Sequence, residues 1–102
     1  MRHFFANVVG ESFRNEDGSD RQAIIPRCRV GERLTLKHEP DNPHDINAIR
    51  VLRHTGEQIG YLGREFAGEV VSRTAKGWGF HALWLASDEP VGPGPTVWLS
   101  LS

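Results

Sequence analysis

The chain has 102 residues, of which 38% are apolar and 25% charged, and twelve Lys and Arg against thirteen Asp and Glu give a formal net charge of −1. This length fits one domain with a modest core, so we expect residues 1–102 to form a single domain. The charge balance excludes a protein that coats nucleic acid through net positive charge alone. No apolar run approaches the roughly 20 residues of a membrane span, so we expect no membrane contact.

The cysteine content and the first residues predict the cellular location. The single cysteine, Cys28, excludes an internal disulfide and fits a reducing compartment. The first residues lack the apolar segment and the cleavage site of a signal peptide. We therefore expect a cytoplasmic location.

Six segments have the composition or the alternation of β-strands. In chain order they are 3–9, 32–38, 47–53, 58–62, 78–86 and 96–101. The alternation is clearest in 32–38, where Leu34 and Leu36 share one face. A tight connection at Gly56 joins 47–53 to 58–62 and predicts a hairpin.

One segment, 64–74, has the periodicity of an amphipathic helix. Its apolar residues recur at three- and four-residue spacing, and Gly77 follows its end. A short helix or a packed irregular turn is expected in 22–29, which contains Pro26. The segments 11–20 and 87–95 are rich in turn-forming residues and are predicted to be loops.

Six short strands and one clear helix predict a mainly β fold. We expect a small, partly open, antiparallel β-barrel of the OB-like or SH3-like kind. An open barrel has a free edge strand, to which a second chain could bond.

The polar turn at 39–45 precedes a predicted strand. Pro40 and Pro43 fix their own φ angles, and Asp41, Asn42 and Asp45 have short side chains that can bond the nearby backbone. Such a stiff turn can hold polar groups in fixed positions. Turn chemistry alone leaves open whether these residues bind a ligand or only shape the loop.

The spacing within this turn disfavours metal binding and catalysis. His38, Glu39, Asp41, His44 and Asp45 fall within eight residues, but they match neither a calcium loop nor a zinc site. His44 could act as a base that Asp41 or Asp45 orients, yet no nucleophile motif or phosphate-binding glycine loop accompanies them. We therefore expect no catalytic residue, no metal and no cofactor.

A binding surface accounts better for several aromatic and basic residues. Phe13 is an aromatic residue in a polar loop and is followed by Arg14, while Tyr61 lies near the end of a strand and Arg64 opens the helix. Aromatic faces and arginines are what single-stranded nucleic acid needs for base stacking and phosphate pairing. The alternative is that Phe13 and Tyr61 are core residues that cap the barrel.

The string E-P-D-N-P-H-D-I-N-A-I-R-V at 39–51, followed by G-E-Q-I-G-Y-L at 56–62 and by Phe66 and Ala67, resembles the HIRAN domain family. The opening V-V-G-E-S-F at 8–13 and the pair Arg21-Gln22 fit as well, so the resemblance covers nearly the whole chain. It implies an OB-like barrel with small helices that binds DNA. In helicase-like ATPases that remodel stalled replication forks, domains of this family grip single-stranded DNA at a free 3′ end.

The resemblance assigns site residues position by position. The family's aromatic and basic cluster after the first strand corresponds to Ser12, Phe13 and Arg14. Its aromatic–aspartate pair corresponds to His44 and Asp45, where an imidazole replaces the larger aromatic ring.

The family's basic residue at the start of the helix corresponds to Arg64, and Tyr61 stands where the family can carry another polar ring. The resemblance thus predicts stacking of bases on Phe13 and His44, a hydrogen bond from a terminal hydroxyl to Asp45, and phosphate pairing by Arg14 and Arg64.

The sequence therefore predicts a non-catalytic module that binds single-stranded DNA, at a free 3′ end, in DNA repair or replication. A helicase or nuclease is the expected partner protein. The alternative is a protein-interaction module that docks on a partner enzyme through Trp98 and a barrel edge, without direct DNA binding.

Overall fold

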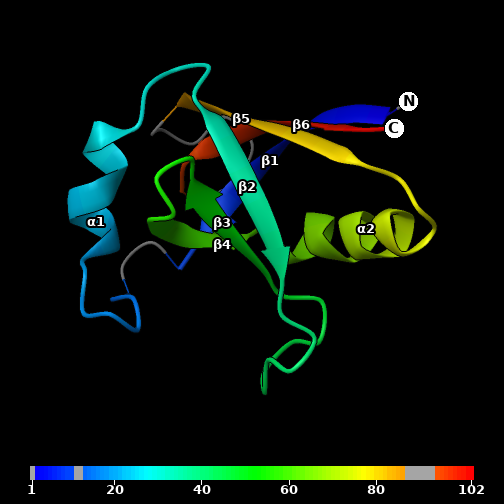
Figure 1. Cartoon of the computed structure of the whole chain (residues 1–102), viewed down its shortest axis with the longest axis horizontal. Helices are drawn as coiled ribbons and strands as arrows, with labels where there is room; N and C mark the ends of the chain where they lie inside the picture. The colour runs from blue at the N-terminus through cyan, green and yellow to red at the C-terminus, as the bar shows by residue number, and fades with distance from the viewer. Residues whose placement is uncertain (1, 11–12, 87–93) are drawn as a thin grey trace.

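The structure is a computed structural model that describes residues 2–10, 13–86 and 94–102. The described strands are β1 (Arg2–Val9), β2 (Arg33–His38), β3 (Ile49–Arg53), β4 (Gln58–Leu62), β5 (Phe80–Ala86) and β6 (Thr96–Leu101). The helices are α1 (Arg21–Ile24), the short 3-10 helix η1 (Ile25–Arg27) and α2 (Arg64–Ala75) (Figure 1). Most of the predicted loop at 87–95, and residues 11 and 12 of the loop at 11–20, lie outside the described residues.

The six strands form a closed antiparallel barrel in the order β1-β4-β3-β2-β5-β6. Two seams are short: β1 meets β4 at Val8–Leu62 and Val9–Tyr61, and β2 meets β5 at Arg33–Leu83 and Leu34–Ala82. The mainly β fold is thus confirmed. The expectation of a partly open barrel is corrected, because these two short pairings close the ring and leave no described strand with a neighbour on one side only.

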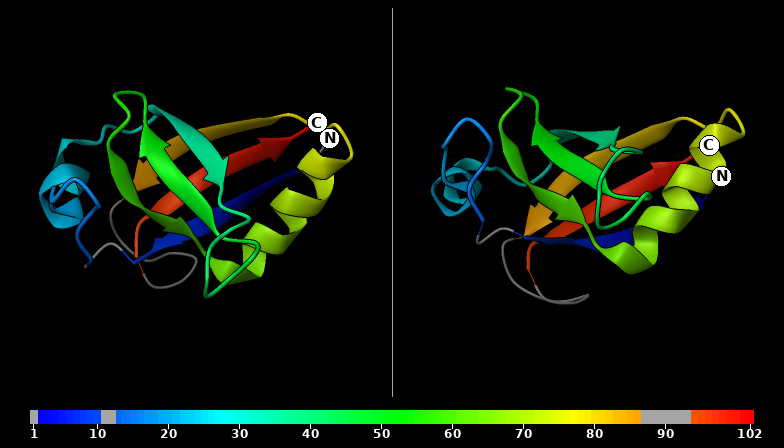
Figure 2. Two further views of the ribbon diagram at one scale, coloured as in Figure 1. Left: turned by 60° about the horizontal axis from the view of Figure 1, so that its bottom comes forward. Right: turned by 90° about the horizontal axis from the view of Figure 1, so that it is seen from below.

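Alternate residues of the strands fill the barrel, as the sequence pattern predicts. Leu34 and Leu36 are buried, and Val97, Leu99 and Leu101 of β6 are fully buried. The helices α1 and α2 lie at opposite ends of the barrel (Figure 2). On α2, the buried residues Ala67 and Val70 belong to the same core. Phe66 stacks on Phe4 of β1, with ring centroids 5.7 Å apart.

The strand predicted at 78–86 is shorter in the structure. It begins at Phe80, and Phe80 is exposed while Ala82 and Trp84 are buried. The connection after α2 explains the difference, because Gly77 adopts a φ of 93° and the Gly79 N–H donates to the Ser102 carbonyl oxygen at 2.8 Å. Trp78 belongs to this connection and packs instead under the Arg73 guanidinium, 4.7 Å from its ring centroid.

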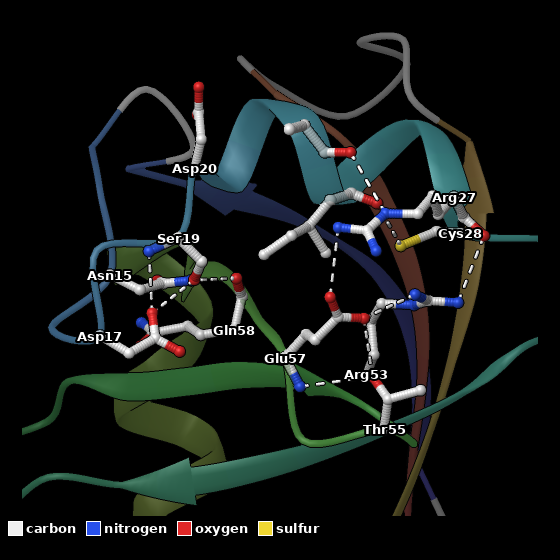
Figure 3. A network of polar contacts seen from close by, with 12 residues as sticks. Asn15, Asp17, Ser19, Asp20, Arg27, Cys28, Arg53, Thr55, Glu57 and Gln58 are labelled. Carbon is white, nitrogen blue, oxygen red and sulfur yellow. Dashed lines mark hydrogen bonds and ion pairs between the residues drawn. The ribbon is translucent and has the colours of Figure 1, made fainter.

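Arg53 ties η1 to the β3–β4 hairpin (Figure 3). Its Nε donates to Glu32 Oε2 and its Nη1 to Glu57 Oε1, both at 2.8 Å. Nη2 donates to the Arg27 carbonyl oxygen at 3.3 Å. The Arg53 and Glu32 side chains are only 10% and 7% exposed. This buried cation is therefore matched by carboxylates, as a buried charge requires.

None of the described helices has the length and hydrophobicity of a transmembrane segment.

Candidate nucleic-acid interface

The turn between β2 and β3 is held by its own polar side chains, as predicted. Asn42 Oδ1 accepts from the N–H groups of His44 at 2.9 Å and Asp45 at 3.0 Å. Asp45 Oδ1 accepts from the Asn47 N–H at 2.9 Å. Asn42 Nδ2 donates to Glu39 Oε1 at 3.1 Å. These bonds fix the backbone that carries His44 and Asp45.

A cavity of about 470 Å³ opens beside this turn, within the range of small-ligand sites. Its described lining comes from the ends of β1 and β4, the loop after β1, the start of α1, the segment between β2 and β3, and the start of α2. Five of the six predicted site residues line it: Phe13, His44, Asp45, Tyr61 and Arg64.

The sixth predicted residue, Arg14, does not line the cavity. It is exposed, its Nη1 donates to the Gly18 carbonyl oxygen at 3.2 Å, and its backbone pairs with Asp20. Ser12, which the resemblance places beside it, lies outside the described residues.

The two predicted rings differ in exposure. Phe13 is 68% exposed, so it is a surface residue and not a core residue that caps the barrel. Tyr61 is half-buried, and its hydroxyl donates to Glu39 Oε1 at 3.0 Å. Burial, together with this bond to the carboxylate, raises the pKa of Tyr61 above its ordinary value. The phenol therefore stays neutral near pH 7.

Asp45 and Arg64 form an ion pair in the cavity lining. Arg64 Nε lies 3.5 Å from Asp45 Oδ2, with side chains 78% and 22% exposed. Such an exposed pair is weak, so Arg64 can turn to another anion at little cost. Arg64 is the first residue of α2, and Gly63 at the N-cap offers no side chain to the helix N–H groups. Free N–H groups at a helix start favour a negatively charged ligand.

Arg21, for which no role is predicted from the sequence, also lines the cavity. Arg21 is only 6% exposed. Its Nη1 donates to the Gly10 carbonyl oxygen at 2.7 Å and its Nε to Asn15 Oδ1 at 2.6 Å. The guanidinium carbon lies 5.4 Å from the Tyr61 ring centroid. A short helix shows no hydrophobic periodicity that would reveal a buried arginine at its start. The family resemblance at Arg21-Gln22 was the one sequence feature that marked this position.

Asn15, which accepts from Arg21, anchors the loop after β1 to the barrel (Figure 3). Its Nδ2 donates to the Gln58 carbonyl oxygen at 3.0 Å and to Ser19 Oγ at 2.9 Å. The loop that carries Phe13 is therefore bonded to β4, which carries Tyr61.

In the part of the chain that the structure describes, no three His, Cys, Asp or Glu side chains gather in a way that could hold a metal ion. His38, the last residue of β2, has its Nε2 2.7 Å from the Ile46 carbonyl oxygen.

Comparison with curated proteins finds similarity to helicase-like transcription factors. A stretch of 39 residues is 50% identical to the protein of Oryctolagus cuniculus and 46% identical to that of Homo sapiens. The stretch covers 38% of this chain but only 4% of each of these much longer proteins.

Two solved structures share the fold. The crystal structure of the HIRAN domain of human HLTF aligns with a TM-score of 0.66 at 24% identity, over 97% of this chain and 72% of that one. A protein from Lactobacillus plantarum aligns with a TM-score of 0.75, also at 24% identity, over 94% of this chain and 91% of that one. The HIRAN domain model itself matches residues 1–84. This chain therefore belongs to the HIRAN domain family.

Proposed function

We propose that this protein is a non-catalytic module that binds single-stranded DNA, with a free 3′ end as its preferred target, in DNA repair or replication. The observation that carries the proposal is the convergence of Phe13, His44, Asp45, Tyr61 and Arg64 on one cavity. These residues come from separate parts of the chain, and three carry rings, one a carboxylate and one a guanidinium.

The rings and Arg64 supply what a single strand needs. Phe13 and His44 are exposed and can stack on bases, while Tyr61 offers a neutral polar ring deeper in the cavity. Arg64 at the start of α2 can pair with a phosphate. Stacking on aromatic side chains and pairing with cations together give sequence-tolerant binding of single strands.

Asp45 supplies a preference for the strand end. Its Oδ1 is occupied by the Asn47 N–H, whereas among the described residues the one partner of Oδ2 is the exposed Arg64 side chain at 3.5 Å. Oδ2 can therefore accept a hydrogen bond from a terminal 3′-hydroxyl. A 3′-phosphate would bring a like charge to the same carboxylate and bind more weakly.

Membership of the HIRAN family supports a place beside enzymes that process DNA, since the similar curated proteins are named helicase-like transcription factors. In this proposal the module brings a helicase or nuclease partner to a strand end.

The test is fluorescence anisotropy of labelled ten-nucleotide strands that end in a 3′-hydroxyl or a 3′-phosphate. Affinity should fall as salt rises, because binding releases counterions, and the hydroxyl strand should bind more tightly. Asp45→Asn should lose this preference, whereas Asp41→Asn, in the same turn but outside the cavity lining, should keep it. A flat signal at every salt concentration contradicts DNA binding, and equal affinities for both ends contradict end recognition.

The outer surface of β6 favours a second candidate, a protein-docking module. Trp98 is half-buried there, stacks on His3 with centroids 5.9 Å apart and meets His81 edge-on at 6.3 Å. Exposed Phe5 pairs with Trp98 in the strand register. A free barrel edge was expected for docking, but every described strand has a neighbour on both sides. The Trp98 surface is therefore the remaining candidate for docking. If the cavity is the DNA site, Trp98→Ala should leave DNA affinity unchanged.

A further inference from the structure

We infer that Arg21 forms an oxyanion subsite on the inner wall of the cavity, where its guanidinium binds a backbone phosphate of the strand whose end occupies the cavity. The inference rests on the proposed function and extends it from stacking and end recognition to a fixed phosphate contact.

The two buried arginines of the chain differ in their partners. Arg53, 9% exposed, is bonded to the carboxylates of Glu32 and Glu57. Arg21 is 6% exposed, and among the described residues it has no ion pair. Its bonds go to two neutral acceptors, the Gly10 carbonyl oxygen and Asn15 Oδ1.

A buried cation without a matching anion is unfavourable, because desolvation of the charge is not compensated. A guanidinium carries five N–H donors, and the two bonds of Arg21 use only Nη1 and Nε. Within the described residues Nη2 has no hydrogen-bond partner, while the side chain lines the cavity. An anion that enters the cavity would both supply the missing charge and accept from these donors.

The surroundings of Gly10 show that Arg21 and the rings of Phe13 and Tyr61 approach the same point of the cavity wall. A Cβ atom at Gly10 would be 3.4 Å from Arg21 Nη1, 3.7 Å from Phe13 Cδ2 and 3.8 Å from Tyr61 Cδ2. The three side chains therefore surround this glycine. A phosphate bound to Arg21 would lie next to the exposed Phe13 ring, which is the place of the backbone when a base stacks on that ring.

Arg21 and Arg64 can hold a phosphate in different ways. Arg64 is 78% exposed and free to move. Arg21 is fixed by its two bonds and by its place 5.4 Å from the Tyr61 ring centroid, so its planar fork is already oriented. Oriented guanidinium forks bind phosphate oxygens by two parallel hydrogen bonds. Arg21 should therefore bind the phosphate of one particular linkage, whereas Arg64 should attract any phosphate near it.

The test uses three ten-nucleotide strands, each with one neutral methylphosphonate in place of one of the last three phosphate linkages. Anisotropy is measured for the wild-type protein, for Arg21→Gln, and for Arg14→Gln as a control with an exposed arginine outside the cavity lining. The wild type should lose roughly ten- to hundredfold in affinity at one linkage, the range for a hydrogen bond to a charged group. Arg14→Gln should show the same loss, whereas Arg21→Gln should bind the charged and neutral strands equally.

If the role of Arg21 is purely structural, Arg21→Gln should weaken binding of every strand by the same factor. The neutral linkage would then cost Arg21→Gln as much affinity as it costs the wild type. That result overturns the subsite but not the proposed function. A wild-type protein that binds no strand overturns both. If Arg21→Gln does not fold, the wild-type Arg21 Nε–Hε resonance serves instead. It should shift at saturation with the charged strand and less with the methylphosphonate strand, and equal shifts overturn the subsite.

Discussion

Replacement of Phe13 by alanine should weaken DNA binding without loss of stability. Phe13 is 68% exposed and lines the cavity, so it contributes little to the core, and the free energy of unfolding should change by no more than about 0.5 kcal/mol. A base stacked on an aromatic ring contributes about 1–3 kcal/mol. The dissociation constant should therefore rise about 5- to 150-fold.

The assay is anisotropy of a labelled ten-nucleotide strand, together with urea unfolding of each variant. Phe5→Ala is the matched control, because Phe5 is also an exposed phenylalanine, at 53%, but does not line the cavity. Phe5→Ala should bind like the wild type. Equal affinity of Phe13→Ala and wild type, or an equal loss in both variants, would refute the stacking role.

Three further predictions concern stability. Arg53→Met leaves the buried Glu32 carboxylate without its cation and should lower the free energy of unfolding in urea by about 3–5 kcal/mol. The hydrogen bonds from Arg53 hold the pKa of Glu32 below its ordinary value, so this stabilisation is complete above about pH 4.3 and is lost as the pH falls through the lowered pKa. Urea unfolding between pH 6 and 3 should show this fall, and Glu32→Gln should reduce it. Gly60→Ala should lower the melting temperature, because its Cβ would lie 2.5 Å from the Val9 carbonyl oxygen; Gly68→Ala, whose nearest neighbour would be 3.7 Å away, should not.

Alternation in the sequence was enough to place the strands but not to close the barrel. The strand predicted at 32–38 is observed as Arg33–His38, and Leu34 and Leu36 are both buried as the alternation predicts. Closure depends on short pairings between distant segments, such as Val9 with Tyr61 and Leu34 with Ala82. Alternation says which face of a strand is buried, but it does not say which strand lies beside it.

The site was predicted only in part, because local sequence patterns do not reveal contacts between distant segments. The family motif placed His44 and Asp45 in one turn, and the structure brings Phe13 to the same cavity. Arg14 follows Phe13 directly, but its side chain bonds the Gly18 carbonyl oxygen and does not line the cavity. The burial of Arg21 depends on the loop after β1 folding back onto β4, which no local pattern in the sequence encodes.

The most direct test of the central claim is an amide chemical-shift titration of the isotope-labelled protein with a short single strand that ends in a 3′-hydroxyl. The largest shifts should fall on the residues that line the cavity, among them Gly10, Phe13, Asp45 and Tyr61. Shifts confined to the outer surface around Trp98, or no shifts at saturating DNA, would contradict the proposal that this cavity is the DNA-binding site.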